Sequence, residues 1–289
     1  MRDFKLTAAM FLILLCMGFS GCAHKQTSNV NSGSIMSSQE HEKLGDVLMS
    51  RGNSEMAMVQ YNRSLELDPL NKNARNKKEL ILMHGDNNQE ALREFKTIVE
   101  ADPEYAPAYE GMGRSYYHMR NYDQAQLNFL QALSLDPDLW RPRAFLGMIY
   151  DRRGENSQAI EEYQKAIELN PENGSLYNNL GVSYSMVQEF DKAVNAFRSA
   201  LDLQFQDPAV YNNLGLALAK TGRYDSALEA FRKAGSEAQA YNNLGCIYLN
   251  KYRYREAVRA FEKAIELDPS FYLTAGENLK KARIGLGEI

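Results

Sequence analysis

One five-residue phrase occurs three times in this chain and constrains its fold more than any other feature. The sequence Tyr-Asn-Asn-Leu-Gly fills residues 177–181, 211–215 and 241–245. A second phrase, Ala-Ile-Glu-Leu-Asn/Asp-Pro, fills residues 166–171 and 264–269. Where the pattern is complete, equivalent residues lie 34 positions apart. A period of this length predicts an array of short helical units rather than one compact domain.

Each repeat carries two apolar stripes with helical spacing. In the best-preserved repeat the first stripe is Tyr177, Leu180 and Tyr184, and the second is Ala193, Phe197 and Ala200. Gly181 and Ala193 are small, so the two helices can approach closely. Pro171 ends the preceding repeat because proline lacks the amide hydrogen that a helix interior needs. One such helix pair cannot cover its own apolar face, so neighbouring pairs must stack into a solenoid.

The period and its signature residues resemble the tetratricopeptide repeat (TPR). In the third repeat these residues are Tyr109, Met112, Gly113, Tyr116, Ala125, Phe129, Ala132 and Pro137. The resemblance implies an all-α, right-handed superhelical solenoid of about seven helix-turn-helix repeats. The repeats are expected to begin at about residues 38, 72, 106, 140, 174, 208 and 238 and to cover residues 38–271. Residues 272–289 are expected to form a C-terminal capping helix.

Two repeats depart from the pattern. The second has Lys78 and Glu79 where Leu-Gly is expected, which makes its first helix the weakest assignment. The sixth is four residues short, which removes about one turn of its second helix. Ser236 followed by Gln239 predicts a capping box at the start of the next helix.

The N-terminal residues are predicted to lie outside the fold. Residues 1–21 have a short basic start and an apolar run, as in a signal peptide. The sequence before Cys22 resembles a lipobox, the cleavage site of bacterial lipoproteins, and implies that Cys22 carries the lipid. An ordinary secretory signal with an incidental cysteine is the alternative. Residues 22–37 are polar and without period, so we expect a lipidated flexible tether.

Composition and motifs argue against catalysis. The four histidines are not at metal-ligand spacing, and no phosphate loop or nucleophile motif is present, so we predict no catalytic residues, metal or cofactor. Cys246 lies between Gly245 and Ile247 without an activating base, as expected of a small packed side chain. The formal net charge of −4 provides no basic field for nucleic acid.

The TPR resemblance implies a concave groove lined by the first helices. Carried onto this sequence, the groove positions are Asn178, Asn179, Asn212, Asn213, Asn242, Asn243, Met186 and Lys220, with a more basic group at Arg114, Tyr117 and Arg152. An asparagine amide offers a donor and an acceptor, so Asn179, Asn213 and Asn243 could form a ladder along an extended peptide. The alternatives are that the asparagines bond between repeats or persist from duplication of one unit, and that the basic group is a solvated inner face.

An anchor, a tether and TPRs together resemble envelope lipoproteins, more narrowly the TPR lipoproteins of tight-adherence (Flp) pilus systems. This resemblance implies a scaffold that assists assembly of a pilus or secretin. The alternatives are an adaptor for envelope proteases or peptidoglycan-remodelling enzymes, in one form a homodimer, and a chaperone-like lipoprotein for exported chains. Ala23 is not an aspartate, so by Gram-negative sorting the expected location is the outer membrane, facing the periplasm.

Overall fold

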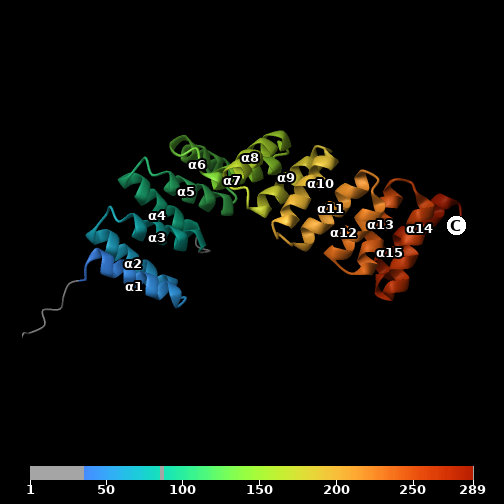
Figure 1. Ribbon diagram of the computed structural model, residues 1–289, viewed down its shortest axis with the longest axis horizontal. Coiled ribbons are helices and arrows are strands. Elements are labelled where there is room, and N and C mark those ends of the chain that lie inside the picture. The colour runs from blue at the N-terminus through green and yellow to red at the C-terminus, as the bar shows by residue number, and fades with distance from the viewer. Residues whose placement is uncertain (1–35, 85–87, 289) are drawn as a thin grey trace, which may run out of the picture.

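The computed structural model describes residues 36–84 and 88–288, and these form an elongated row of helix pairs (Figure 1). Helices with odd numbers up to α13 are the first helices of the pairs, and the even-numbered ones are the second helices. The α-helices are α1 (Ser38–Ser50), α2 (Ser54–Leu67), α3 (Lys72–His84), α4 (Asn88–Ala101), α5 (Ala106–His118), α6 (Tyr122–Leu135), α7 (Trp140–Arg152), α8 (Asn156–Leu169), α9 (Gly174–Met186), α10 (Phe190–Asp202), α11 (Pro208–Lys220), α12 (Tyr224–Ala234), α13 (Glu237–Asn250), α14 (Tyr254–Leu267) and α15 (Tyr272–Leu286).

The predicted all-α repeat solenoid is confirmed. Seven helix pairs follow one another along the described chain, and α15 packs on the last pair after a short 3-10 turn at Pro269–Phe271. The predicted signal peptide, Cys22 and nearly all of the predicted tether lie outside the described residues. Among the described helices, none combines the length and the apolar character that crossing a membrane requires.

A glycine and an aromatic ring hold the two helices of a pair together. A Cβ atom added to Gly181 of α9 would lie 2.7 Å from the ring of Phe197 in α10, whose side chain is fully buried. The same relationship, at the same separation of 16 residues, recurs in five further pairs: Gly45–Tyr61, Gly113–Phe129, Gly147–Tyr163, Gly215–Phe231 and Gly245–Phe261. The absent side chain at the glycine therefore sets how closely the helices pack.

The second pair lacks this relationship because Glu79 occupies the glycine position. The corresponding ring, Phe95, lies instead against Gly111 of the next repeat. Helices α3 and α4 accordingly make the least contact of the described pairs, while α4 packs extensively on α5. The sequence singled out α3 as the weakest helix, and the structure shows that the helix forms but that its pairing is altered.

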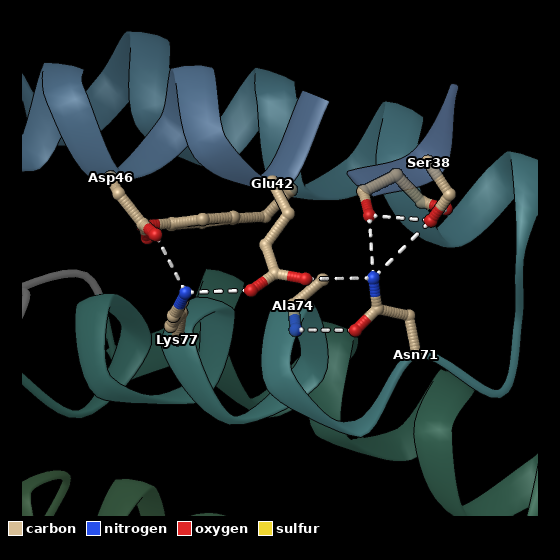
Figure 2. Close-up of polar contacts among 8 residues, drawn as sticks. Ser38, Glu42, Asp46, Asn71, Ala74 and Lys77 are labelled. Carbon is tan, nitrogen blue, oxygen red and sulfur yellow. Dashed lines mark hydrogen bonds and ion pairs between the residues drawn. The ribbon is translucent and has the colours of Figure 1, made fainter. Parts of the chain in front are cut away.

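A polar network joins the first two repeats beside a small apolar cluster of Ala57, Tyr61 and Ala74 (Figure 2). The Asn71 amide donates to the Glu42 carboxylate at 3.0 Å and accepts from the Ala74 backbone N–H at 3.1 Å. Lys77 Nζ lies 2.8 Å from carboxylate oxygens of both Glu42 and Asp46. Asn71 thus caps α3 and also ties it to α1, so one side chain fixes both the start of a helix and its neighbour.

The C-terminal repeats contain a shortened helix, one of the two hydrogen bonds of a capping box, and an end helix. Helix α12 has 11 residues, whereas α14 has 14. The Ser236 hydroxyl caps α13 by accepting from the Gln239 backbone N–H at 3.1 Å. In α15, Leu279 and Ala282 are buried against α14, as expected of a helix that covers the apolar end of a solenoid.

Candidate functional site

Two adjoining cavities are lined mainly by the first helices of repeats three to five, together with Leu80 of α3 and Tyr163 of α8. The larger, about 340 Å³, is lined by Leu80, Arg114, Trp140, Arg141, Ala144, Phe145, Met148, Ser175, Leu176 and Asn179. The second, about 330 Å³, is lined by Tyr117, Met148, Asp151, Arg152, Tyr163, Asn179 and Val182. Met148 and Asn179 line both cavities, so the two form one groove, named here the α5–α7–α9 groove.

Helical periodicity places these side chains on one face. On α7, Phe145, Met148 and Arg152 stand at i, i+3 and i+7, so they share a stripe that runs along the groove. Arg114 and Tyr117 stand three apart on α5 and face the same side. Helices α5, α7 and α9 follow one another along the solenoid (Figure 1), so their stripes form one continuous surface.

Aromatic rings contact arginines in and beside the groove. The Arg114 guanidinium lies 5.9 Å from the centre of the Phe145 ring, and that ring is 5.1 Å from Tyr117. Arg152 stacks over Tyr122 at 4.9 Å. These distances are typical of cation–π contacts, which hold the planar guanidinium groups in place.

Two carboxyl groups lie near this surface: Glu110 beneath it, and Asp151 in the lining of the second cavity. Glu110 of α5 is buried, and burial raises its pKa, while the charges of Arg141 and Arg114 act against that rise. Asp151 accepts from the Ser183 hydroxyl at 2.8 Å and from the Tyr163 hydroxyl at 3.1 Å. Burial raises the pKa of Asp151, and these two hydrogen bonds oppose it. Glu110 thus belongs to the interior of the protein, whereas Asp151 is half-buried in the wall of the second cavity.

The six asparagines of the repeated phrase do not behave alike. Asn179 lines both cavities and accepts from the Asn178 amide at 3.3 Å. The Asn243 amide instead donates to Asn212 at 3.2 Å, which joins α13 to α11. Asn242 is buried, with 8% of its surface exposed. Asn213, on the same helix as Asn212, is partly exposed. The structure therefore contains the bond between repeats that was considered from sequence, and the ladder stays a prediction.

The other predicted groove residues lie away from the cavities. Met186 and Lys220 are exposed in the last turns of α9 and α11. Cys246 on α13 is partly covered by α15, where the Asn278 amide lies 3.6 Å from its sulfur. Burial raises the pKa of the Cys246 thiol, so it remains a packed neutral group.

Sequence reasoning missed several residues of the α5–α7–α9 groove. Trp140, Arg141 and Met148 line it although none belongs to the repeated phrase. The sequence feature that could have pointed to the groove is Trp140, the single tryptophan of the chain. Within the described part of the chain, no group of three or more His, Cys, Asp or Glu side chains is placed to hold a metal ion.

Comparison with protein families identifies the repeat. Models described as tetratricopeptide or TPR repeats match residues 41–69, 106–139, 147–188, 178–242 and 238–271. The chain is a tetratricopeptide-repeat solenoid. A search of curated proteins gave no match.

Solved structures share the TPR fold at low sequence identity. YrrB, described as a TPR protein with an unusual peptide-binding site, is 24% identical with a TM-score of 0.57, and the match covers 66% of this chain and all of YrrB. A TPR protein from Parabacteroides merdae is 17% identical with a TM-score of 0.53, over 85% of this chain and 98% of that one. A third similar structure is a chain of the APC/C hetero-tetramer Cut9–Hcn1, which is 21% identical with a TM-score of 0.51. The match covers 86% of the chain described here and 53% of the chain in that complex.

Proposed function

We propose that this TPR chain is a scaffold that binds an extended segment of another protein in the α5–α7–α9 groove. The observation that carries the proposal is the pair of adjoining cavities that share Met148 and Asn179. An extended peptide presents side chains on alternate sides, so every second side chain can enter one of the neighbouring cavities while an amide such as Asn179 pairs with the backbone. The peptide-binding site named for YrrB, a protein of the same fold, supports this reading.

Site-specific photo-crosslinking tests the proposal. A photo-reactive amino acid at Met148, in the shared floor of the groove, should give protein adducts in cells. The matched control is the same amino acid at Leu127, which is 59% exposed on the second helix α6. Adducts from position 148 but not from position 127 would support the groove. Equal yields, or none from position 148, would place the binding surface elsewhere.

We also propose that a lipid on Cys22 anchors the scaffold to a membrane. The support is the sequence before Cys22, since this residue lies outside the described part of the chain. Two or three acyl chains give firm anchoring, because each buried CH₂ contributes about 0.8 kcal/mol. Metabolic labelling with a clickable fatty acid should label the wild type and the control Cys246→Ser, and not Cys22→Ser. Retention of label in Cys22→Ser would contradict the anchor.

The finer role that we propose is assistance to an envelope assembly, such as a pilus or secretin, from the outer membrane. It rests on the sequence resemblance set out above. The adducts from position 148 decide it. A secretin or pilus subunit among them would support assembly, whereas a protease or peptidoglycan hydrolase would favour the adaptor. A mixture of unrelated exported chains would favour the chaperone.

A further inference from the structure

The first repeat presents apolar side chains at the free end of the solenoid. Leu44 and Val47 of α1 and Met56 and Val59 of α2 are between 36% and 48% exposed. Within each helix the two residues stand three positions apart, so they share one face. These four residues are named here the open end face. Helices α1 and α2 lie at the end of the row, and no described helix precedes them (Figure 1).

Later repeats bury the positions that Leu44 and Val47 occupy in α1. In the last four repeats the equivalents of Leu44 are at most 8% exposed: Leu146, Leu180, Leu214 and Leu244. In the fourth to sixth repeats the equivalents of Val47 are at most 2% exposed: Ile149, Ser183 and Ala217. Each of these first helices packs on the second helix of the preceding repeat. Leu44 and Val47 therefore belong to a surface of the kind that joins one repeat to the next.

The α2 side of this face is apolar where the last two repeats are polar. In the sixth repeat Ser226 and Glu229 occupy the positions of Met56 and Val59, and they line a cavity of about 380 Å³ formed by α10, α11 and α12. These positions thus face the preceding repeat. In the seventh repeat the corresponding residues are Glu256 and Arg259. A terminal repeat needs a polar outer face to stay soluble, so apolar residues on both helices indicate that another surface covers this end.

The two ends of the solenoid differ in this respect. At the C-terminal end, α15 packs on α14 and buries Leu279 and Ala282 (Figure 1). The open end face of another copy finds no matching apolar surface there, so head-to-tail stacking through the two ends is blocked. Contact between two open ends is the remaining arrangement, and it closes as a dimer with two-fold symmetry.

The charged residues of α2 make this helix complementary to its own copy. Glu55 and Arg63 stand four residues before and four residues after Val59. Both side chains are exposed, and within the described chain neither forms an ion pair. If two copies of α2 pack antiparallel about Val59, Glu55 of each copy lies opposite Arg63 of the other. The pairing brings together opposite charges at both ends of the contact.

The same two-fold axis also brings the α1 helices of the two copies together. Gly45 of α1 packs against Tyr61, which is two residues from Val59 on α2, so the axis crosses α1 close to Gly45. In an antiparallel pairing centred just after Gly45, Leu44 of one copy lies opposite Val47 of the other. Apolar side chains therefore meet on both helices.

We propose that the open end face binds the same face of a second copy of this chain and forms a two-fold symmetric dimer. Leu44, Val47, Met56 and Val59 make its apolar centre, and two ion pairs between Glu55 and Arg63 flank that centre. The dimer carries two copies of the α5–α7–α9 groove, so a partner with two binding segments gains affinity from engaging both.

Two other occupants of the open end face fit the observations less well. Acidic residues outnumber basic ones on α1 and α2, which opposes attraction to the anionic headgroups of a membrane. Residues 22–35 contain few apolar side chains with which to cover the face. Contact with lipid and contact with residues 22–35 are therefore outcomes that the test must separate from a dimer.

Photo-crosslinking of the full chain in cells tests the proposal. A photo-reactive amino acid replaces Val59, which lies at the centre of the proposed contact. The control is the same replacement of Leu127, because this exposed residue of α6 holds the position of Val59 in the third repeat. Position 59 should give an adduct of two copies, with the crosslink mapped by mass spectrometry to α2 of the second copy, and position 127 should not.

Charge reversal tests the orientation of the two copies. Glu55→Arg or Arg63→Glu places like charges opposite each other, so the yield of the adduct from position 59 should fall about fivefold, because repulsion replaces attraction in two exposed ion pairs. The double variant Glu55→Arg/Arg63→Glu restores opposite charges and should restore the yield. Glu66→Arg is the control, an exposed change of the same charge on α2 outside the proposed contact, and it should leave the yield unchanged.

Several results would overturn the proposal. Adducts from position 59 with lipid, with residues 22–35 or with a different protein would assign the open end face to another occupant. Equal yields of the two-copy adduct from positions 59 and 127 would mean that the contact is not specific to this face. A double charge reversal that fails to restore the yield would exclude the antiparallel arrangement. None of these results bears on adducts from position 148, so peptide binding in the α5–α7–α9 groove is tested separately.

Discussion

The ring of Phe197 fills the space that a side chain at position 181 would need. A Cβ atom at position 181 would lie 2.7 Å from that ring, and the ring is fully buried, so it has little space to move away. Gly181→Ala should therefore destabilise the protein by about 1–3 kcal/mol, the usual cost of overpacking a core. This loss should outweigh the gain of about 1 kcal/mol in helix propensity. Urea unfolding, monitored by circular dichroism, measures the net change in the free energy of unfolding.

The control for this prediction is Asn195→Ala. Asn195 is exposed on α10, in the same repeat, so its replacement changes helix propensity without altering the core. It should stabilise slightly, by up to about 0.7 kcal/mol. A Gly181→Ala protein as stable as the wild type would mean that the glycine does not set the spacing of the two helices.

Asn71 is predicted to contribute more than an ordinary helix cap. Asn71→Ala removes the bond to the Ala74 N–H and the bonds from the amide to Ser38, Glu42 and Ser64 (Figure 2). We expect a loss of about 2 kcal/mol, from about 1 for the cap and about 1 for the bonds to the first repeat. Hydrogen exchange should show faster opening of α1 and α3 than of α9.

Two further variants separate the contributions of Asn71. Asn53→Ala removes only the cap of α2, an exposed bond of 3.2 Å to the Met56 N–H, and should cost about 1 kcal/mol. Asn71→Asp keeps an acceptor for the cap and places a carboxylate beside Glu42. If Asn71→Ala and Asn53→Ala lose the same stability, the network between the first two repeats contributes nothing.

Repeated residues account for what sequence could predict. Gly181 and Phe197 were identifiable because the same pair recurs throughout the chain, and repetition also fixed the order of the helices. The groove depends instead on which residues of different repeats meet. Trp140 and Arg141 stand at the start of α7, where other repeats have unrelated residues, so no pattern marked them. Which side chains converge depends on the curvature of the stack, which a repeat pattern does not specify.

The asparagines also show that the repeat pattern does not specify which side chains of different repeats meet. Asn179 and Asn243 hold the same place in the same phrase, yet one lines the cavities and the other bonds to Asn212. The short α12 lies between α11 and α13, the two helices that this bond joins. Glu79 illustrates a further limit of prediction from sequence. Its presence at the glycine position indicated a weak repeat, but it did not indicate that the carboxyl group is buried.

Glu79 should make stability depend on pH. Burial raises its pKa to about 7, although the Tyr105 hydroxyl and the charge of Arg75 act against that rise and Glu110 adds to it. The folded protein therefore holds this proton more tightly than the unfolded chain, whose ordinary value is 4.5. Its contribution to stability is greatest below pH 4.5, falls as pH rises towards 7, and is constant above that.

Glu79→Gln removes this titration and keeps the shape of the side chain. At about 1.4 kcal/mol per pKa unit, the variant should exceed the wild type by up to about 3 kcal/mol at pH 8 and match it at pH 4.5. Thermal unfolding at the two pH values measures the difference. Glu104→Gln, an exposed change of the same charge on the loop before α5, should shift little at either pH. A constant difference between Glu79→Gln and the wild type across this range would refute the assignment.

Asn179 and Asn243 should differ in their effect on binding. Asn179→Ala removes an amide from the floor of both cavities, so we expect peptides selected on the wild type from a random display library to bind about tenfold more weakly, or about 1.4 kcal/mol. Asn243→Ala should change affinity less than twofold, because that amide is already bonded to Asn212. Fluorescence polarisation with a labelled selected peptide measures both affinities. The melting temperatures of the two variants should not fall, because alanine has a higher helix propensity than asparagine.

The triple variant Asn179→Ala/Asn213→Ala/Asn243→Ala separates a ladder from a single contact. A ladder predicts that the triple variant loses binding well beyond the loss in Asn179→Ala, whereas equal losses would assign recognition to Asn179 alone.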